Sequence, residues 1–230
     1  VLICTQDAMH VEPAVAFAEA GYHILLEKPM APDEAGCRTI VEAVHRAGVL
    51  LAVAHVDRYT PHTVRLKQLV TDGAVGDVVC IQRTEPVGYW HQAHSFVRGN
   101  WRNEAESSFM LLAKSCHDID WLRHIMGVPC RAVSSFGHLK HFRPDEAPAG
   151  ASERCLDCQV ESDCPYSARK IYLGRLALGH TGWPVDVLTP QPTVDSVTAA
   201  LRDGPYGRCV YHCDNDVVDN QVVNLAFEGD

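Results

Sequence analysis

The residue best placed to do chemistry is the lysine of Glu27-Lys28-Pro29. It follows the apolar run His23–Leu26, which predicts a short buried strand. An ammonium group beside a reacting carbon can hydrogen-bond a hydroxyl and stabilise the alkoxide that forms as hydride leaves. Most lysines are only solvated surface groups. A position directly after a buried strand, where such sheets bind ligands, favours a functional role for Lys28.

A histidine is the second candidate. His117 lies within Ser107–Met126, a long run that predicts a helix. An imidazole is the side chain best suited to accept a hydroxyl proton near neutral pH. The alternative is a histidine that packs in a domain interface, and the helix pattern alone does not separate the two.

Clustered cysteines form a third candidate site. Cys155-x-x-Cys158 and Cys164 stand in one irregular segment, and Cys209 and Cys213 follow later. Thiolates at this spacing can share one tetrahedral metal ion. We expect a structural zinc ion on the first three and Cys213, with Cys209 as the other choice for fourth ligand. An iron–sulfur cluster, reduced thiols or disulfides are the alternatives.

The elements that must position Lys28 alternate along the first part of the chain. Apolar runs predict strands, and amphipathic runs closed by glycine predict helices. The strands are apolar on both faces, which is typical of a parallel sheet covered by helices. The pattern predicts a doubly wound α/β domain. The predicted strands are Val1–Thr5, His23–Leu26 and Val49–Ala54, and the helices are Val11–Ala20 and Asp33–Ala47.

Polar residues follow all three predicted strands. These are Thr5 with His10, Glu27-Lys28-Pro29, and His55 with Arg58-Tyr59. Folds of this class bind ligands at the carboxyl ends of their strands. Three independent strands that deliver polar groups to one edge therefore predict a binding site there.

The rest of the chain predicts a second domain of α+β type with a mainly antiparallel sheet. We place the first domain at residues 1–60 and the second at 61–230. Pro144–Pro165, rich in proline, cysteine and charge, is expected to be irregular. The predicted helices are Pro61–Asp72 and Ser107–Met126, and the strands are Val78–Thr84, Arg131–Phe136, Gly207–Cys213 and Val217–Phe227.

Composition limits the partners. The 230 residues are 47% hydrophobic and carry a net charge of -9, so nucleic acid is an unsuitable partner. No apolar run approaches the ~20 residues of a membrane span. Five of the ten cysteines are scattered in apolar contexts, which favours reduced thiols and a cytoplasmic location. Both ends interrupt strand-like patterns, so we interpret the sequence as truncated at each.

No G-x-G-x-x-G occurs in the chain, although dinucleotide folds carry it on their first βα turn. Either the half of the fold with the phosphate loop is missing, or the domain is a flavodoxin-like fold that never bound a nucleotide.

The sequence resembles the Gfo/Idh/MocA oxidoreductases. The resemblance is carried by Val1-Leu2-Ile3-Cys4-Thr5 with His10, by Gly21 through Pro29, by Arg58-Tyr59-x-Pro61, and by His117-Asp118-Ile119-Asp120. It implies a Rossmann domain that binds NAD or NADP and a second domain that holds a sugar, polyol or related alcohol. It also implies a cis Lys28–Pro29 peptide and a homo-oligomer.

The resemblance places five residues on the cofactor side, Thr5, His10, Glu27, Lys28 and Pro29. Tyr59 and Arg102 are expected to bind substrate because aromatic and Arg side chains suit polyols. Lys114 and Asp118 are also expected to bind substrate.

The sequence also departs from the family pattern near His117. Family members often carry Asp four residues before this histidine and Gly two before it, where this chain has Ala113 and Ser115. Lys114 stands three residues before His117, so a Lys114–His117–Asp118 cluster is expected to take the place of the missing Asp.

The leading hypothesis is an oxidoreductase that moves hydride between NAD(P) and a carbinol carbon, with Lys28 and His117 handling the hydroxyl proton. One alternative is an NAD-dependent enzyme that cleaves glycosides through transient oxidation. Another is a nucleotide-sensing regulator without catalysis.

Overall fold

The computed structural model describes residues 1–229, which pack as two compact units. The first unit comprises Val1–Glu85, Ser107–Ser135 and Val223–Asp230, and the second comprises Pro86–Glu106 and Phe136–Val222. Within the described residues, no helix has the length and apolar character needed to cross a membrane.

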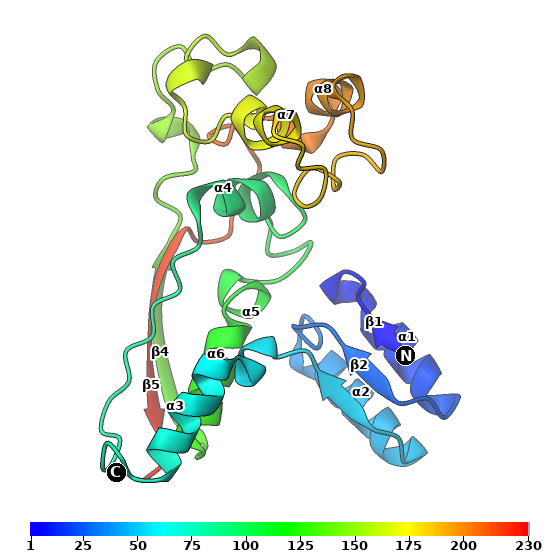
Figure 1. Ribbon diagram of the computed structural model, residues 1–230, viewed down its shortest axis with the longest axis vertical. Helices are drawn as coiled ribbons and strands as arrows, with labels where there is room; N and C mark the ends of the chain where they lie inside the picture. Colours follow the sequence, from blue (N-terminus) through cyan, green and yellow to red (C-terminus); the bar gives the residue numbers. More distant parts are fainter. Residues whose placement is uncertain (230) are drawn as a thin grey trace. The chain divides into compact units, whose positions relative to one another are not determined.

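A three-stranded parallel sheet forms the start of the first unit, in the order β1 (Leu2–Ile3), β2 (Ile24–Leu26), β3 (Leu51–Val53) (Figure 1). Its register explains which face is covered. Ile3 pairs with Leu26, and both are buried. Leu2 pairs with Leu25 on the opposite face, where they are 70% and 42% exposed. The predicted strands are confirmed in place and direction, but only one face of this sheet is buried.

Two helices pack against each other beside this sheet, α1 (Val11–Glu19) and α2 (Glu34–Ala47). The Asp33 side chain caps α2 by accepting from the Gly36 amide at 2.7 Å, and Gly48 ends the helix in the left-handed region. Ala14, Ala18 and Ile40 are fully buried between the layers. Their small or branched side chains bring the helices close to the sheet. Both helices match their predicted ranges to within one residue.

The predicted helix Ser107–Met126 is wrong as one continuous element. The chain forms α5 (Met110–Ala113) and α6 (Cys116–Met126), with a break at Lys114–Ser115. The Ser115 carbonyl accepts from the amides of Asp118 and Ile119, so α6 begins as a new helix. α3 (Pro61–Thr71) confirms the predicted helix nearby, and its Thr63 accepts a 2.9 Å hydrogen bond from the Trp121 indole.

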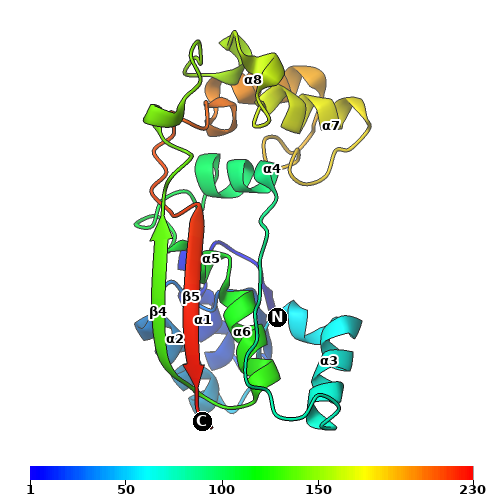
Figure 2. The same ribbon diagram turned by 90° about the vertical axis from the view of Figure 1, so that its left-hand side faces the viewer.

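The second sheet has two strands, β4 (Cys130–His138) and β5 (Asn220–Phe227), which run antiparallel (Figure 2). Two other predicted strands are wrong. Val78–Thr84 forms no strand, and Val79 is 95% exposed. In Gly207–Cys213 the chain turns instead, because Gly207 ends a tight turn against the Leu201 carbonyl that leaves no room for a side chain.

The second unit is built from short helices and turns around an apolar core that contains Tyr172, Val197 and Leu201. Pro144–Pro165 holds only single turns of 3-10 helix, which agrees with its predicted irregularity. The helices are α4 (Tyr89–His91), α7 (Gly174–Ala177) and α8 (Val194–Asp203), with π-helical turns at Gln92–Arg98 and Arg169–Leu173 and 3-10 turns at Pro144–Glu146, Cys155–Asp157, Glu161–Asp163 and Pro205–Gly207. In the first unit, 3-10 turns span Asp7–Met9 and Val56–Tyr59.

Candidate active site

Lys28 leaves the carboxyl end of β2, as the sequence predicts. The Lys28–Pro29 peptide is cis, which confirms that expectation. The side chain is half-buried, and its Nζ donates a 2.9 Å hydrogen bond to the carbonyl oxygen of Ala113. The first unit therefore brings together two positions 85 residues apart in the sequence.

His10 holds the backbone around Lys28. It is fully buried, with Nδ1 2.9 Å from the Pro29 carbonyl oxygen and Nε2 3.1 Å from that of Thr5. Each ring nitrogen therefore lies within hydrogen-bonding distance of a backbone carbonyl oxygen, one after β1 and one after β2. The Thr5 hydroxyl donates to the Met9 carbonyl at 3.2 Å, and Glu27 accepts from the Lys28 amide at 3.1 Å. The geometry gives His10 a positioning role.

His117 lies near a second histidine, His55, which follows β3. Their ring centroids are 6.2 Å apart and the planes are 82° from parallel. The Nδ1 atom of each ring is buried and has no hydrogen-bond partner among residues 1–229. Burial lowers the pKa of His117, and the nearby Lys28 ammonium lowers it further. Burial likewise lowers the pKa of His55, against the opposing effect of Asp120. Both imidazoles are therefore neutral near pH 7.

Cys116 completes the surroundings of Lys28. Burial raises the pKa of its thiol to about 11, although the Lys28 charge acts in the opposite direction. The thiol is therefore protonated at neutral pH. Lys28 is the cation within a half-buried group of otherwise neutral side chains, His55, Cys116 and His117.

Asp120 and Arg58 form an ion pair beside this group. The guanidinium binds the carboxylate through two nitrogens, with Nε 2.7 Å from Oδ2. The Asp120 Oδ1 also lies 3.8 Å from Nε2 of His55. The sequence placed His55 among the polar residues of the predicted binding edge and Asp120 in the family motif, but it assigned neither a specific chemical role. His55 stood at a strand end, which was a usable signal, but the contact with Asp120 depends on the tertiary fold.

The expected Lys114–His117–Asp118 cluster does not form among the described residues. Lys114 pairs with Glu85 at 3.1 Å, and Asp118 accepts from Arg83 at 2.7 Å. The break between α5 and α6 removes the helical spacing on which that expectation rested. Neither side chain orients His117.

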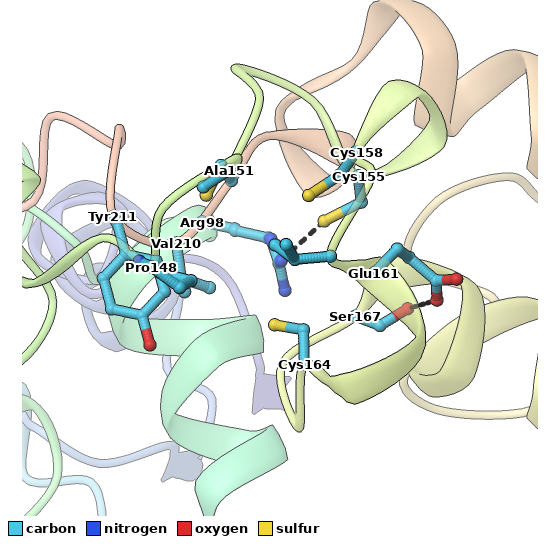
Figure 3. Close-up of a pocket in the computed structure, with 12 residues that line it drawn as sticks. Arg98, Pro148, Ala151, Cys155, Cys158, Glu161, Cys164, Ser167, Val210 and Tyr211 are labelled. Atoms are coloured by element: carbon cyan, nitrogen blue, oxygen red, sulfur yellow. Dashed lines mark hydrogen bonds between the residues drawn. The ribbon is translucent and has the colours of Figure 1, made fainter.

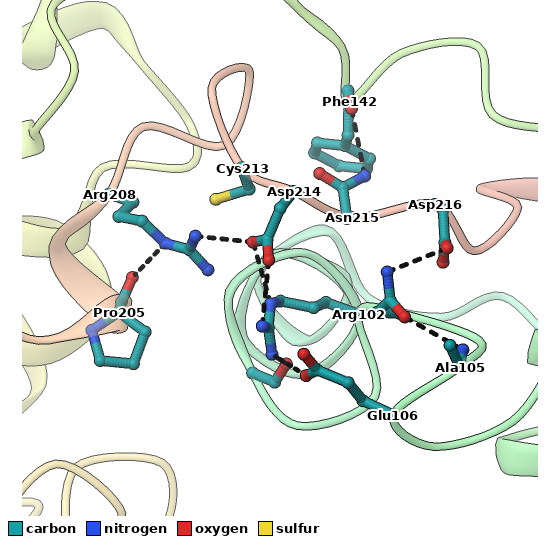
Figure 4. Close-up of polar contacts among 12 residues, drawn as sticks. Arg102, Ala105, Glu106, Phe142, Pro205, Arg208, Cys213, Asp214, Asn215 and Asp216 are labelled. Atoms are coloured by element: carbon teal, nitrogen blue, oxygen red, sulfur yellow. Dashed lines mark hydrogen bonds and ion pairs between the residues drawn. The ribbon is translucent and has the colours of Figure 1, made fainter.

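Two other residues expected to bind substrate are Tyr59 and Arg102. Tyr59 is 77% exposed. Arg102 belongs to the second unit, where it binds both oxygens of Asp214 at 3.0 Å (Figure 4). Arg208 binds the same carboxylate at 2.6 Å. Hydrogen bonds from Arg102 and then Arg208 hold the pKa of Asp214 well below its usual range. These contacts fix the Arg102 side chain within its own unit, and its expected role in binding substrate stays a prediction.

The cysteine cluster lies entirely in the second unit. Cys155, Cys158, Cys164 and Cys209 line one cavity of about 20 Å³ (Figure 3). Cys213 is not among its lining residues, and its Sγ donates to the Cys209 carbonyl at 3.2 Å. In the part of the chain that the structure describes, no three His, Cys, Asp or Glu side chains are grouped closely enough to hold one metal ion.

Two sequence models of known families match the chain. Residues 1–55 match the oxidoreductase family with an NAD-binding Rossmann fold, and residues 63–163 match the GFO/IDH/MocA C-terminal domain. The two matches cover successive parts of the chain, and they include Lys28 in the first and His117 in the second.

The individual proteins that match this chain are distant relatives. The chain is 30% identical over 136 residues to scyllo-inositol 2-dehydrogenase (NADP(+)) IolW of Bacillus subtilis, covering 59% of this chain and 36% of the relative. It is 26% identical over 145 residues to 2,7-anhydro-N-acetylneuraminate hydratase of Escherichia coli, covering 63% of this chain and 38% of that relative.

A solved structure agrees in fold. Aldose-aldose oxidoreductase from Caulobacter crescentus matches with a TM-score of 0.50 at 23% identity, over 61% of this chain and 41% of that one. The chain thus spans less than half the length of each of these three relatives. With both family models matched in order, and with the cis Lys28–Pro29 peptide at the end of β2, this chain belongs to the Gfo/Idh/MocA family of NAD(P)-dependent oxidoreductases.

Proposed function

We propose that the protein transfers hydride between NAD(P) and a carbinol carbon of a sugar, polyol or related alcohol. The observation that carries the proposal is the position of Lys28. Its ammonium lies at the carboxyl edge of the parallel sheet, close enough to two half-buried, neutral imidazoles to lower the pKa of both. A cation beside neutral proton acceptors is the arrangement that oxidation of an alcohol requires.

The residues present fit the reacting end of a nicotinamide cofactor. The Nδ1 atoms of His55 and His117 are buried without partners within residues 1–229, so neither ring is committed to another described residue through that nitrogen. Thr5 and Pro29 stand at neighbouring strand ends, where Rossmann folds hold their ligand. When bound, the nicotinamide ring accepts a hydride in oxidation or supplies one in reduction.

Lys28 is expected to orient and stabilise the reacting oxygen. Its Nζ donates to the Ala113 carbonyl, which fixes the ammonium and leaves its remaining N–H groups for a ligand. As the hydroxyl loses its proton, negative charge develops on the oxygen, and the Lys28 charge stabilises that alkoxide.

His117 is expected to accept the hydroxyl proton. Because its pKa is lowered by burial and by Lys28, the imidazole is neutral at physiological pH and carries a free lone pair. His117 would take the hydroxyl proton as the carbinol carbon is oxidised to a carbonyl carbon. In reduction the protonated imidazole would return that proton to the oxygen.

The test uses the full-length protein with NAD or NADP and a panel of polyols that are deuterated at the carbinol carbon. The expected result is deuterium on the nicotinamide ring, with the transfer lost in Lys28→Met and His117→Asn. Undiminished transfer in both variants would refute the assigned roles.

A second candidate is a reaction without net oxidation, in which transient oxidation permits bond cleavage or hydration. It is supported by the similarity to 2,7-anhydro-N-acetylneuraminate hydratase. The same residues would act on the hydroxyl in both directions within one turnover. Product formation without accumulation of reduced cofactor would favour this candidate, whereas stoichiometric reduced cofactor would favour the first.

We also propose that the protein is a homo-oligomer. The β4–β5 sheet exposes Val133, Phe136 and Val222 by 62%, 75% and 64%, which is unusual for apolar side chains on a regular sheet. Light scattering on the full-length protein tests this, and a monomer at micromolar concentration would contradict it.

A further inference from the structure

A cavity of about 440 Å³ in the first unit is lined by Arg58, Arg123, His124 and Gly127. We propose that this cavity binds a phosphate group, either inorganic phosphate or the phosphate of a small organic molecule. The proposal does not depend on the function proposed above, because none of the residues assigned to hydride transfer lines the cavity.

One face of α6 supplies two of the lining side chains. Asp120 precedes Arg123 and His124 by three and four residues, and Gly127 follows them by four and three. These spacings place all four residues on the same face of the helix. Gly127 ends α6 in the left-handed region, so the chain contributes only backbone at this end of the cavity.

Arg58 comes from a different element, the 3-10 turn Val56–Tyr59, which packs against α6. The Asp120 carboxylate holds the guanidinium through its Nε and Nη2. The side chain is still 38% exposed, and its Nη1 has no hydrogen-bond partner among residues 1–229. The guanidinium is therefore oriented by one carboxylate and keeps N–H groups for a second anion.

Arg123 adds a second guanidinium to the same cavity. It is exposed, and within the described part of the chain no hydrogen bond or ion pair joins its side chain to another residue. A single exposed arginine is ordinarily only solvated. Here two guanidinium groups share one cavity, and none of the described residues that line it is acidic. In a chain with a net charge of -9, this is a local excess of positive charge that attracts anions.

His124 responds to the same positive charge. Burial lowers the pKa of its imidazole, and Arg58 and then Lys67 lower it further, against the opposing effect of Asp120. The Lys67 ammonium donates to the Ile125 carbonyl and does not line the cavity. An anion between the lining side chains would offset these positive charges and favour the protonated imidazole, which then donates to the anion.

The balance of charge favours phosphate over a carboxylate. The two arginines and a protonated His124 carry three positive charges, of which Asp120 neutralises one. A phosphate dianion neutralises the other two, whereas a carboxylate neutralises only one. The planar guanidinium groups also match the oxygens of phosphate in pairs. The volume falls within the ~300–1,000 Å³ of pockets that hold small molecules, so an organic part has room.

The experiment is an NMR titration of the full-length protein with inorganic phosphate. The His124 resonance, assigned with His124→Asn, reports on this cavity wherever else phosphate binds. Saturating phosphate should raise the pKa of His124 by at least about 0.5, because a dianion beside the ring favours its protonated form.

Arg123→Gln should weaken the phosphate affinity measured at His124 by roughly 10–100-fold, because charge-assisted hydrogen bonds are lost. Arg123 is exposed, so this variant should fold, which circular dichroism checks. Arg65→Gln is the matched control, since it removes an arginine of α3 that donates to Gln68 and does not line the cavity. The control should keep the affinity within about twofold.

Two further probes identify the ligand. Glycerol 3-phosphate that binds more tightly than inorganic phosphate would support a phosphorylated small molecule, and equal or weaker binding would support inorganic phosphate. Acetate that binds as tightly as phosphate would overturn the assignment to phosphate. An unchanged His124 resonance at about 10 mM phosphate, or equal affinity in Arg123→Gln and the unmutated protein, would overturn the site itself.

Discussion

The Lys28 ammonium donates a 2.9 Å hydrogen bond to the main-chain carbonyl of Ala113, not to a side chain. Ala113 occupies the position where the family resemblance leads one to expect an aspartate. The lysine is therefore oriented by a backbone group at the end of α5, immediately before the break that starts α6. This contact connects the end of β2 to α5, the short helix that directly precedes the helix carrying His117.

The first prediction concerns Lys28 itself. Lys28→Met should lower kcat/KM by roughly 10²–10⁴-fold, because the alkoxide loses its stabilising charge. Lys67→Met is a matched control, since the Lys67 Nζ also donates to a carbonyl, that of Ile125, at 2.9 Å. The control should keep kcat/KM within a few fold. Steady-state kinetics on both variants checks this, and similar losses in the two would show that any lost lysine contact has the same effect.

The second prediction concerns the pKa of His117. Burial and then the Lys28 charge lower this pKa, so removing the charge should raise it while the effect of burial remains. In NMR titrations, His117 of Lys28→Met should therefore protonate at a higher pH than in the unmutated protein. His124, whose pKa is lowered by burial and by Arg58 and Lys67, should not change. An unchanged His117 titration would mean that Lys28 does not act on it.

Local patterns predicted the first unit well, since its elements depend on nearby residues. The Asp33 cap and Gly48 set the bounds of α2, and the short apolar runs set the parallel strands. The predicted strand Val78–Thr84 does not form because its β-branched residues have no partner strand, and strand propensity counts only when pairing is available.

At the site, Lys28 was predictable from its position at the end of a predicted strand. The contacts of Lys28 with Ala113 and of His55 with Asp120 join residues more than 60 positions apart, which no local pattern encodes.

The third prediction concerns Asp219, whose carboxylate accepts from three successive backbone amides. The amides of Lys140, His141 and Phe142 lie 3.1, 2.6 and 3.3 Å from its Oδ2. Asp219→Ala should lower the free energy of unfolding by roughly 1–3 kcal/mol, because it leaves these donors unsatisfied. Asp186→Ala, at an exposed aspartate, is the control and should change it by less than about 0.5 kcal/mol. Urea denaturation measures both, and equal effects would contradict the role of Asp219.

The fourth prediction concerns His94, a buried histidine that hydrogen-bonds the Tyr172 hydroxyl at 2.9 Å. Burial lowers the pKa of His94 to about 4, with His91 and Arg98 adding to the effect. The unfolded chain, with a histidine pKa of about 6.5, then binds more protons than the folded chain at intermediate pH. His94 therefore makes its full contribution to the free energy of unfolding above pH 6.5. This contribution falls as the pH drops towards 4, by about 3 kcal/mol in total.

His94→Phe should remove that part of the pH dependence of unfolding while retaining a ring against Tyr206. His180→Phe, at an exposed histidine, should leave it unchanged. Thermal unfolding between pH 4 and pH 7 measures the difference. A variant with the same loss of stability on acidification as the unmutated protein would place the effect in other groups.

The last prediction concerns the turn that replaces the expected strand Gly207–Cys213. A Cβ at Gly207 would lie 1.7 Å from the Leu201 carbonyl oxygen, which belongs to the backbone of α8 and cannot rotate away. Gly207→Ala must therefore displace the turn or the helix end, and it should destabilise the protein by at least about 1–3 kcal/mol. Gly182→Ala is the control, because a Cβ there meets no atom within 4 Å. Gly182→Ala should leave the free energy of unfolding nearly unchanged, and urea denaturation of both variants measures the difference. Retained stability in Gly207→Ala would show that α8 and this turn are not packed as closely as the structure places them.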